Sequence, residues 1–357
     1  MKVLQIMPEM GLAGAETMCE SLCNELKAIG CDVILVSLYD YQSAITRRLQ
    51  ENNIKIYFLK KKHGLDITII FKLLSLFFKE KPQCVHTHRY VMRYVIPAAF
   101  LSRVPTRIHT VHNVAQKENT PIGIFVNRYF YRYFNVIPVA LSNQVLKTIV
   151  DVYGLSPTSI PVIFNGIDLK KCIRKSDYSS DNCFTILHIG RFAEAKNHRL
   201  ILNTFRKIVS RHPNTQLKLI GAGKLLSEIK SLAKELEIED KVCFLGQIDN
   251  IYPILHDADI FILPSEYEGM PMTLIEAMGT GVPIIASNVG GIPDMLTNDV
   301  DALLIKPDIN DLFSAIEKLI LNKEKREMLG KNALIRAQEF SSKIMAQKYY
   351  KLYTGNK

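Results

Sequence analysis

The 357-residue sequence has no run of about 18 apolar residues, so no segment of it is expected to span a membrane. No secretion signal is expected either, because the N-terminal stretch MKVLQIMP is short and is soon followed by Glu9. The seven cysteines are an odd number, and no paired Cys or His motif completes a zinc site. We therefore expect a cytoplasmic protein whose cysteines are reduced and lie in the core.

The charge balance is basic, with 45 Lys and Arg against 35 Asp and Glu. A net charge of +10 favours anionic partners such as nucleotide phosphates, nucleic acid or an acidic membrane face. A uniformly solvated basic surface is the plain alternative. The length and the hydrophobic fraction of 48% are typical of a globular protein with two cores.

Short apolar segments alternate with helical ones along the chain, which predicts two doubly wound parallel sheets with a cleft between them. The expected strands are 2–8, 33–38, 54–59, 84–88, 106–112, 136–141 and 161–164, then 184–189, 216–220, 242–244, 260–263 and 282–286. The charged, Ser- and Asp-rich residues 170–182 are typical of a linker between domains. The tail from Asp311 onward is predicted to be helical and basic.

Residues 257–294, DADIFILPSEYEGMPMTLIEAMGTGVPIIASNVGGIPD, contain a strand, a loop, a helix, a second strand and a glycine turn. The loop carries Glu266 and Glu268, and the helix carries Glu276. Loops of such a unit gather at the carboxyl ends of the strands, where open α/β sheets bind ligands. The sequence therefore predicts clustered carboxylates at a binding edge.

The strongest cationic signal is HIGRFAEAKNH, residues 188–198. Arg191 directly follows the expected strand end at Gly190, and Lys196 lies five residues further on. Arginine offers a rigid fork to phosphate oxygens and lysine a mobile point charge. A diphosphate leaving group needs such cations because negative charge builds on it as its bond to a sugar breaks. Gly221, which ends the next strand, lets the backbone approach a ligand.

His88 and His112 end two expected strands of the first half, at its own binding edge, although either can be purely structural. The loop GLAGAET, which contains Gly14, lacks the G-x-G-x-x-G spacing of a dinucleotide site, and this weakens a dehydrogenase interpretation. Bare amides at the start of the following helix suit a phosphate or a sugar hydroxyl. A role in a tight turn alone is equally open.

Aromatic and basic residues alternate in RYFYRYF, residues 128–134. Exposed aromatics along a groove would suit stacking on nucleic acid, whereas the same residues on amphipathic helices would suit an anionic membrane face. Aromatics in the core with solvated arginines are the third alternative. The sequence leaves all three open.

Together these motifs resemble the GT-B glycosyltransferases of the large retaining family 4, also called glycosyl transferases group 1. The resemblance covers essentially the whole chain. Its most specific part is the E-x7-E pair of Glu268 and Glu276, preceded by PSEYEG and followed by GGIPD. GRFAEAKN, the GAG turn, FLG at 244–246, NGID and GLAGAE agree with it.

The resemblance implies an α/β fold of the GT-B type, with two doubly wound Rossmann-like domains that face each other across a cleft. An acceptor-binding domain is expected at 1–168 and a nucleotide-sugar donor-binding domain at 169–335. The C-terminal helix, 336–357, is expected to pack back on the first domain. The implied activity is a retaining transfer of a sugar from a nucleotide sugar, preferably a UDP-sugar, to a lipid-linked saccharide in cell-surface polysaccharide biosynthesis.

The resemblance also assigns site residues. The catalytic set is expected to be His112 beside the donor sugar, Arg191 and Lys196 on the diphosphate, and Glu268 on the sugar hydroxyls, with the cations across the cleft from the carboxylates. Further donor-binding residues are expected to be Gly14, Gly190, Gly221, Gly246, Gln247, Gly269, Met270, Met272, Thr273 and Glu276, the last accepting hydrogen bonds from the ribose. Acceptor-side candidates are Glu16, His88, Arg89 and Asn165.

No metal or other cofactor is expected, since the resemblance implies that Arg, Lys and amides bind the diphosphate. Asp257 and Asp259 have DxD spacing but precede a strand, far from the loop edge. A glycosidase pair of carboxylates is disfavoured because a hydrolase has no use for an Arg–Lys clamp. The resemblance implies front-face substitution without a protein nucleophile. The chain departs from the commonest pattern at Ala13, Pro271 and Asp294.

Other functions stay open at this stage. Within the fold they are a soluble enzyme that glycosylates a small molecule or a protein, and a sugar-nucleotide epimerase. A nucleotide-sugar sensor without catalysis and a basic nucleic-acid-binding protein are further alternatives, the last supported by no motif. The expected location is the cytoplasm, with peripheral contact to the inner face of the cytoplasmic membrane as an open extension.

Overall fold

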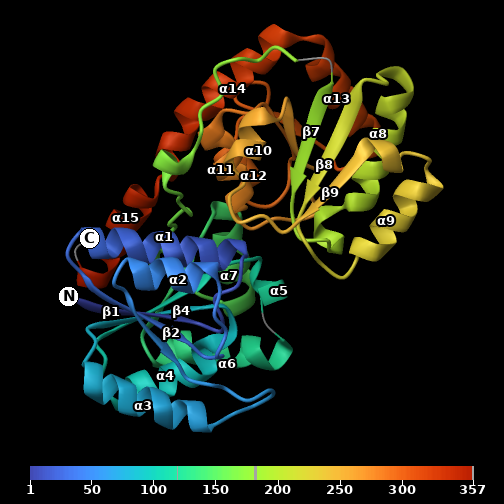
Figure 1. Cartoon of the computed structure of the whole chain (residues 1–357). Helices are drawn as coiled ribbons and strands as arrows, with labels where there is room; N and C mark the ends of the chain where they lie inside the picture. Colours follow the sequence, from blue (N-terminus) through green and yellow to red (C-terminus); the bar gives the residue numbers. More distant parts are fainter. Residues whose placement is uncertain (119, 181–182, 356–357) are drawn as a thin grey trace. The chain divides into compact units, whose positions relative to one another are not determined.

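The computed structural model describes residues 1–118, 120–180 and 183–355. The chain divides into two compact units, which are coloured by sequence in Figure 1. Unit 1 consists of Met1–Ile167 together with Ser341–Lys357, and unit 2 consists of Asp168–Phe340. Residues 181–182 of the expected linker and 356–357 of the expected last helix lie outside the described residues.

The sheet of unit 1 has six parallel strands in the order β3-β2-β1-β4-β5-β6. Their bounds are β1 Lys2–Met7, β2 Asp32–Ser37, β3 Lys55–Phe58, β4 Cys84–His88, β5 Thr106–Val111 and β6 Val136–Ala140. The central strands β1 and β4 are buried along nearly their whole length because helices cover both sides of a parallel sheet, although β4 carries two histidines and a threonine. The strand predicted at 161–164 is wrong, since Val162 makes only an isolated bridge with Ala140.

Eight helices of unit 1 are described: α1 Gly14–Ala28, α2 Ala44–Glu51, α3 Thr68–Glu80, α4 Met92–Leu101, α5 Ala115–Glu118, α6 Pro121–Tyr133, α7 Asn143–Tyr153 and α15 Ser342–Thr354. Helix α4 packs against both α3 and α6, and the three lie on the same side of the sheet in Figure 1. Helix α15 packs against α1, and Ser342 N donates to the carbonyl of Ile167 at 2.7 Å. The last helix of the chain thus belongs to the core of unit 1.

The sheet of unit 2 also has six parallel strands, in the order β12-β11-β10-β7-β8-β9. Their bounds are β7 Phe184–Ile189, β8 Thr215–Ile220, β9 Val242–Gly246, β10 Ile260–Leu263, β11 Ile284–Ser287 and β12 Leu303–Ile305. The helices are α8 His198–Arg211, α9 Leu226–Glu235, α10 Tyr252–Asp257, α11 Met272–Thr280, α12 Ile292–Met295, α13 Ile309–Leu321 and α14 Lys323–Ala337. The sequence pattern did not indicate β12, whose three residues are too few to show a periodicity.

The segment predicted as a linker is fixed to unit 2 over its described part. Tyr178 is 2% exposed, and its hydroxyl donates to the carbonyl of Gly281 at 3.0 Å. Arg326 Nη2 in turn donates to the carbonyl of Tyr178 at 2.8 Å. The polar segment begins close to the boundary between the units, and one aromatic side chain anchors its described part to unit 2.

The cysteines are all free in the described structure, but they are not all core residues. Cys19, Cys23, Cys31 and Cys84 are buried in unit 1, as expected. Cys183 and Cys243 are exposed, and Cys172 lies between these extremes. The prediction of core cysteines is therefore wrong for these three in unit 2.

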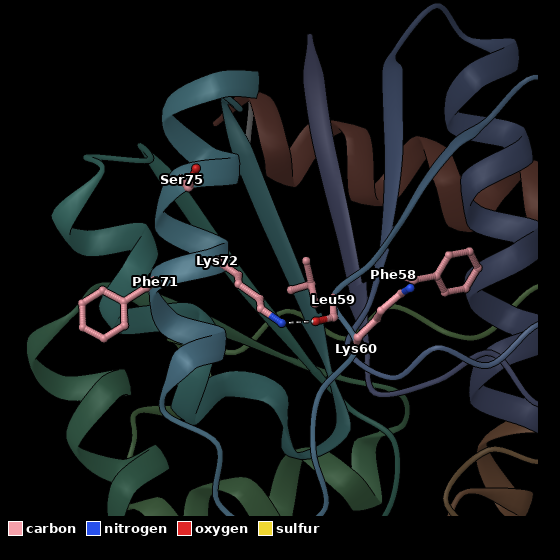
Figure 2. Close-up of a pocket in the computed structure, with 6 residues that line it drawn as sticks. All are labelled: Phe58, Leu59, Lys60, Phe71, Lys72 and Ser75. Atoms are coloured by element: carbon pink, nitrogen blue, oxygen red, sulfur yellow. Dashed lines mark hydrogen bonds between the residues drawn. The ribbon is translucent and has the colours of Figure 1, made fainter.

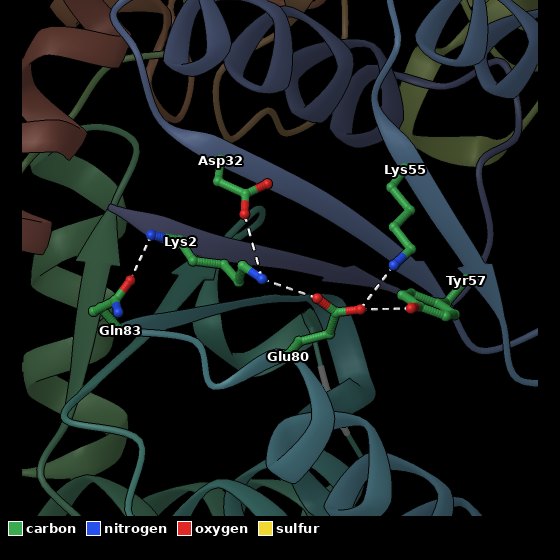
Figure 3. A network of polar contacts seen from close by, with 6 residues as sticks. All are labelled: Lys2, Asp32, Lys55, Tyr57, Glu80 and Gln83. Carbon is green, nitrogen blue, oxygen red and sulfur yellow. Dashed lines mark hydrogen bonds and ion pairs between the residues drawn. The ribbon is translucent and has the colours of Figure 1, made fainter.

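A polar cluster closes the amino edge of the unit 1 sheet, and Figure 3 shows it. Glu80, the last residue of α3, accepts from Lys2 Nζ at 3.0 Å, from Lys55 Nζ at 2.8 Å and from the Tyr57 hydroxyl at 2.5 Å. Lys55 first, then Tyr57 and Lys2, lower the pKa of Glu80 to about 2. One carboxylate therefore ties β1 and β3 to the end of α3.

Candidate active site

The carboxyl edge of the unit 2 sheet carries two loops that are tied to each other. The first follows β7 and contains a short 3-10 helix, Glu194–Lys196, and the second follows β10. Glu266 N donates to the carbonyl of Ala195 at 2.9 Å, and Asn197 Nδ2 donates to Glu266 Oε1 at 2.5 Å. These bonds bring together the two motifs that the sequence singled out.

Lys196 and Glu268 meet where these loops join. Lys196 Nζ lies 2.5 Å from Glu268 Oε1, and Ser265 Oγ donates to the same oxygen at 2.6 Å. The two side chains are 19% and 9% exposed. The sequence predicted the cation across a cleft from the carboxylate, which is wrong because both residues lie in unit 2 and touch. Arg191, next to Gly190, is exposed at the same edge.

Glycines allow the backbones of this edge to approach closely. Gly221 has φ +143°, and a Cβ there would lie 2.0 Å from the carbonyl oxygen of Gly190. Gly290, with φ +56°, sits against the loop itself, since its Cβ would lie 1.9 Å from the carbonyl oxygen of Glu268. The second contact explains the first glycine of GGIPD, Gly290, whose support of Glu268 the sequence reasoning missed.

Glu276 projects from α11, which begins at Met272 directly after Pro271. It is 8% exposed, and burial raises its pKa to about 7. Burial disfavours the carboxylate form, and the carboxylate can accept hydrogen bonds from two vicinal hydroxyls at once when these take the place of water.

The other predicted donor residues of unit 2 surround these groups. Gly221 N donates to the carbonyl of Gly246 at 2.8 Å, which joins the ends of β8 and β9, and Gln247 after it is exposed. Gly269, Met270 and Met272 are buried, and Thr273 is partly exposed on the first turn of α11. The structure thus places all predicted donor residues of unit 2 at or next to the carboxyl edge of one sheet.

The DxD spacing of Asp257 and Asp259 lies at the opposite edge. Asp259 precedes β10 and accepts from Thr185 N, at the start of β7, at 2.7 Å. It therefore caps the amino end of the sheet, as its position before a strand predicted. Within the described residues, no group of three or more His, Cys, Asp or Glu side chains could hold a metal ion.

In unit 1 the two histidines of the carboxyl edge are in contact. His88 Nδ1 lies 3.0 Å from His112 Nε2, and His88 Nε2 lies 2.8 Å from Gln5 Oε1. His88 is fully buried with both ring nitrogens engaged, and its role as an acceptor-side residue stays a prediction. His112 is half-buried, and burial lowers its pKa to about 3, which keeps the ring neutral.

The remaining acceptor-side predictions divide into surface and interior residues. Glu16 is 2% exposed and pairs with Arg89 Nη1 at 2.5 Å, so Glu16 positions Arg89 and does not itself face solvent. Asn165 is 3% exposed, and its place on the acceptor side stays a prediction. Arg89 and Gly14, the first residue of α1, remain accessible.

Several residues of these sites carried no usable sequence signal. Gln5 and Glu118 surround the two histidines, and Glu118 Oε1 accepts from His112 N at 3.0 Å. Burial raises the pKa of Glu118 to about 8. The sequence indicated only that Ser265 lies in a loop, three residues before Glu268, and did not predict its hydrogen bond to Glu268.

Two family profiles match adjoining parts of the chain. Residues 12–171 match the description "Glycosyltransferase Family 4", and residues 170–336 match "Glycosyl transferases group 1". The chain belongs to the family 4 glycosyltransferases. The recognition from the E-x7-E and GRFAEAKN motifs is therefore confirmed, and the protein is a glycosyltransferase.

Known family 4 glycosyltransferases and solved structures resemble the chain along most of its length. The UDP-Gal:alpha-D-GlcNAc-diphosphoundecaprenol alpha-1,3-galactosyltransferase of Escherichia coli is 28% identical over 71% of this chain and 70% of its own. The capsular polysaccharide biosynthesis glycosyltransferase CapM of Staphylococcus aureus is 27% identical over 81% and 80%. Anabaena Alr3699/HepE, solved in complex with UDP-glucose, has a TM-score of 0.88 at 18% identity and covers 99% of each chain. That structural likeness confirms the GT-B fold.

Proposed function

We propose that this glycosyltransferase moves a sugar from a UDP-sugar to a lipid-linked saccharide during synthesis of a cell-surface polysaccharide. The observation that carries the proposal is the joined pair of loops in unit 2, where Arg191, Lys196 and Glu268 lie at one sheet edge with Glu276. Cations for a diphosphate and carboxylates for hydroxyls are the groups that a nucleotide sugar requires.

Each group then has a definite task. Arg191 and Lys196 stabilise the charge that builds on the departing UDP, while Glu276 accepts hydrogen bonds from the ribose and Glu268 from the transferred sugar. Glu268 Oε1 already accepts from Lys196 and Ser265, and this makes that oxygen a poor nucleophile. We therefore propose front-face substitution with retention of configuration and no covalent enzyme intermediate. Because two protein cations serve the diphosphate, we propose that transfer needs no metal.

The relatives support the choice of substrates. The Escherichia coli relative is named for UDP-Gal and for an acceptor linked to diphosphoundecaprenol. The Anabaena structure contains UDP-glucose. A shared family and a nearly complete overlap of both units make the same donor nucleotide the first choice for this chain.

A lipid-linked acceptor requires contact with a membrane, and unit 1 carries an apolar and basic face that suits it. Just before and along α3, Leu65, Ile67, Phe71 and Phe78 are 75%, 61%, 69% and 59% exposed. Lysines border this stripe, and Figure 2 shows Phe71 with Lys60 and Lys72 around a hollow of about 550 Å³ at the end of β3. Exposed aromatics beside lysines fit an anionic lipid surface.

Helix α6 continues this face on the other side of α4. Ile122, Phe125, Tyr129 and Tyr133 are 78%, 71%, 50% and 65% exposed, and Arg128 and Arg132 are exposed between them. Phe130 and Tyr131 point into the core instead, so only part of the RYFYRYF segment is available. Among the residues that the structure describes, no helix is long and apolar enough to cross a bilayer. We propose that α3 and α6 lie on the anionic inner membrane surface without inserting through it.

A thermal-shift screen with UDP-, GDP- and ADP-sugars tests the donor, because a bound donor stabilises the folded chain by mass action. We expect stabilisation by UDP and by one UDP-sugar. A response to GDP- or ADP-sugars alone contradicts the donor class.

Release of UDP with GlcNAc-diphosphoundecaprenol as acceptor, in the presence of EDTA, then tests the acceptor and the independence of transfer from metal. The anomeric configuration of the product, measured by NMR, tests retention.

A further inference from the structure

A continuous chain of side-chain hydrogen bonds crosses the interior of unit 1 and ends at His112. It joins side chains from β1, β4, β5 and α15 to the residue that follows β5. The links are Tyr349 Oη–Thr110 Oγ1 at 2.8 Å, Thr110 Oγ1–His86 Nε2 at 2.7 Å, His86 Nδ1–Tyr353 Oη at 2.7 Å, Tyr353 Oη–Gln5 Nε2 at 3.0 Å, Gln5 Oε1–His88 Nε2 at 2.8 Å and His88 Nδ1–His112 Nε2 at 3.0 Å. Every member except His112 is buried.

The orientation of Gln5 sets the direction of the last two bonds. Its amide nitrogen donates to Tyr353 Oη, so its carbonyl oxygen faces His88 and must accept. His88 therefore carries its proton on Nε2, and its Nδ1 offers a lone pair. That lone pair accepts from His112, which places the His112 proton on Nε2 and leaves His112 Nδ1 unprotonated.

His112 Nδ1 is the open end of the chain. Among the described residues it has no hydrogen-bond partner, and it does not belong to the buried polar atoms left unsatisfied, so it reaches the surface of unit 1. Glu118 fixes the backbone beside it by accepting from His112 N at 3.0 Å. An unprotonated ring nitrogen in this position can accept a hydrogen bond but cannot donate one.

We propose that Gln5, His88 and Tyr353 are positioning residues that hold His112 in its Nε2–H tautomer, so that Nδ1 accepts a hydrogen bond from a substrate hydroxyl. The inference rests on the proposed function, because it requires a substrate hydroxyl to reach His112 Nδ1 at the carboxyl edge of the unit 1 sheet. It makes the docking of α15 part of the site, since Tyr353 orients the Gln5 amide. The opposite tautomer would present an N–H group, which cannot accept from the hydroxyl.

The alternative is that this network of side-chain hydrogen bonds only stabilises the core of unit 1. Buried polar networks stabilise a fold poorly compared with apolar residues of similar shape, whereas a fully bonded network fixes the geometry of its members. A purely structural network would hold the same tautomer at His112 but would have no effect on catalysis. The two roles therefore differ in whether a change of tautomer at His112 also changes the rate of UDP-sugar cleavage.

The protonated nitrogen of His112 can be observed by long-range ¹H–¹⁵N NMR of the full chain labelled with ¹⁵N-histidine, with the His112 signals identified by their loss in His112→Gln. We expect the Nε2–H pattern in the wild type. An Nδ1–H pattern, or an even mixture of both tautomers, overturns the proposal whatever the variants do.

Two substitutions of Gln5 test the cause. Gln5→Leu removes the acceptor for His88 Nε2, so we expect mixed tautomers at His112 and roughly a tenfold lower rate of UDP-sugar cleavage. Gln5→Glu keeps an acceptor for His88 and should restore both the Nε2–H pattern and much of the lost rate. If the carboxylate introduced by Gln5→Glu prevents folding, Tyr353→Phe takes its place. This variant leaves the amide nitrogen of Gln5 without its acceptor, and mixed tautomers at His112 are expected. An unchanged His112 pattern in folded Gln5→Leu would overturn the positioning role.

The same experiments separate this inference from the proposed function. His112→Ala is expected to slow UDP-sugar cleavage while UDP still raises the melting temperature. A normal rate of UDP-sugar cleavage by His112→Ala would contradict the proposed contact between His112 and the substrate. Loss of any UDP response in the wild type, by contrast, contradicts the donor assignment and leaves the NMR measurement able to decide the tautomer.

Discussion

Lys196 Nζ lies 2.5 Å from Glu268 Oε1, although 72 residues of sequence separate them. Ser265 holds the same carboxylate oxygen, and both side chains are largely withdrawn from solvent. In the donor-free protein, the cation expected to bind the diphosphate is therefore already in contact with the carboxylate expected to bind the sugar. Under the proposed function, the donor sugar and its phosphate would bind on either side of this contact.

Removal of either member of this pair should abolish most transfer. We expect Lys196→Ala and Glu268→Ala each to lower kcat/KM by about 10²- to 10³-fold, since each loses transition-state contacts and leaves its partner unpaired. The double variant should lose less than the product of the two effects, because the residues are coupled. Lys331→Ala, which breaks the exposed pair with Glu327, is the matched control. Near-normal rates in both single variants contradict the site.

Glu276 should make the donor-free protein sensitive to pH. Burial raises its folded pKa from 4.5 to about 7, so its ionisation opposes folding. The free energy of unfolding of the wild type falls as pH rises from about 4.5 through 7. Glu276→Gln does not undergo this loss, so its free energy of unfolding should exceed that of the wild type by up to about 3 kcal/mol at pH 8. Melting curves at pH 5 and pH 8 should show the gain only at pH 8, with the exposed Glu324→Gln as control. The same variant should bind UDP more weakly. Equal melting temperatures of Glu276→Gln and the wild type at both pH values would contradict the prediction.

Gly290 should be required for the position of Glu268. Gly290→Ala adds a Cβ that would lie 1.9 Å from the Glu268 carbonyl oxygen, at φ +56°. Gly154→Ala is its control, since φ is +65° but the nearest atom is the flexible end of Arg132 at 3.5 Å. Both variants carry a backbone cost of about 1 kcal/mol, but only Gly290→Ala should lower kcat/KM, by roughly tenfold or more. Equal activities would show that the contact does not position the loop.

Phe71 should contribute to membrane contact. Phe71→Ser removes an aromatic side chain that is 69% exposed on α3, and we expect weaker co-sedimentation with phosphatidylglycerol vesicles. Ile335→Ser in unit 2, where the side chain is 72% exposed, should sediment like the wild type. Binding should fall as salt rises, because the adjacent lysines attract the lipid charge. Absence of wild-type binding favours the soluble alternative for this enzyme.

Glu80 should stabilise unit 1 above acidic pH. Its pKa is lowered to about 2 in the folded chain by Lys55, Tyr57 and Lys2, so its contribution is complete above about pH 4.5 and disappears as pH falls to 2. Glu80→Gln should therefore melt at a lower temperature than wild type at pH 7, and the difference should vanish toward pH 2. Glu51→Gln, at an exposed helix position, is the control. A difference that persists at pH 2 contradicts the ionic origin.

Local patterns in the sequence determined much of this protein. Apolar runs of strand length between helical segments specified two parallel sheets, and the motifs 188–198 and 257–294 placed charged groups at strand ends. Parallel strands collect their carboxyl ends at one edge, so these groups had to lie there. The short strand β12 and the anchored Tyr178 escaped because neither has a periodic pattern.

Tertiary structure alone decided which of those groups touch. His88 and Asn165 occupy motif positions, yet both side chains are buried in unit 1. Gln5 looks like an ordinary strand residue, but it bonds Tyr353 across 348 residues and so orients the histidines. A sequence records the spacing of neighbours along a chain, whereas hydrogen bonds form between atoms about 3 Å apart in space. The edge of each sheet is therefore readable from the sequence, while the proton positions and ion pairs at that edge depend on how distant segments pack.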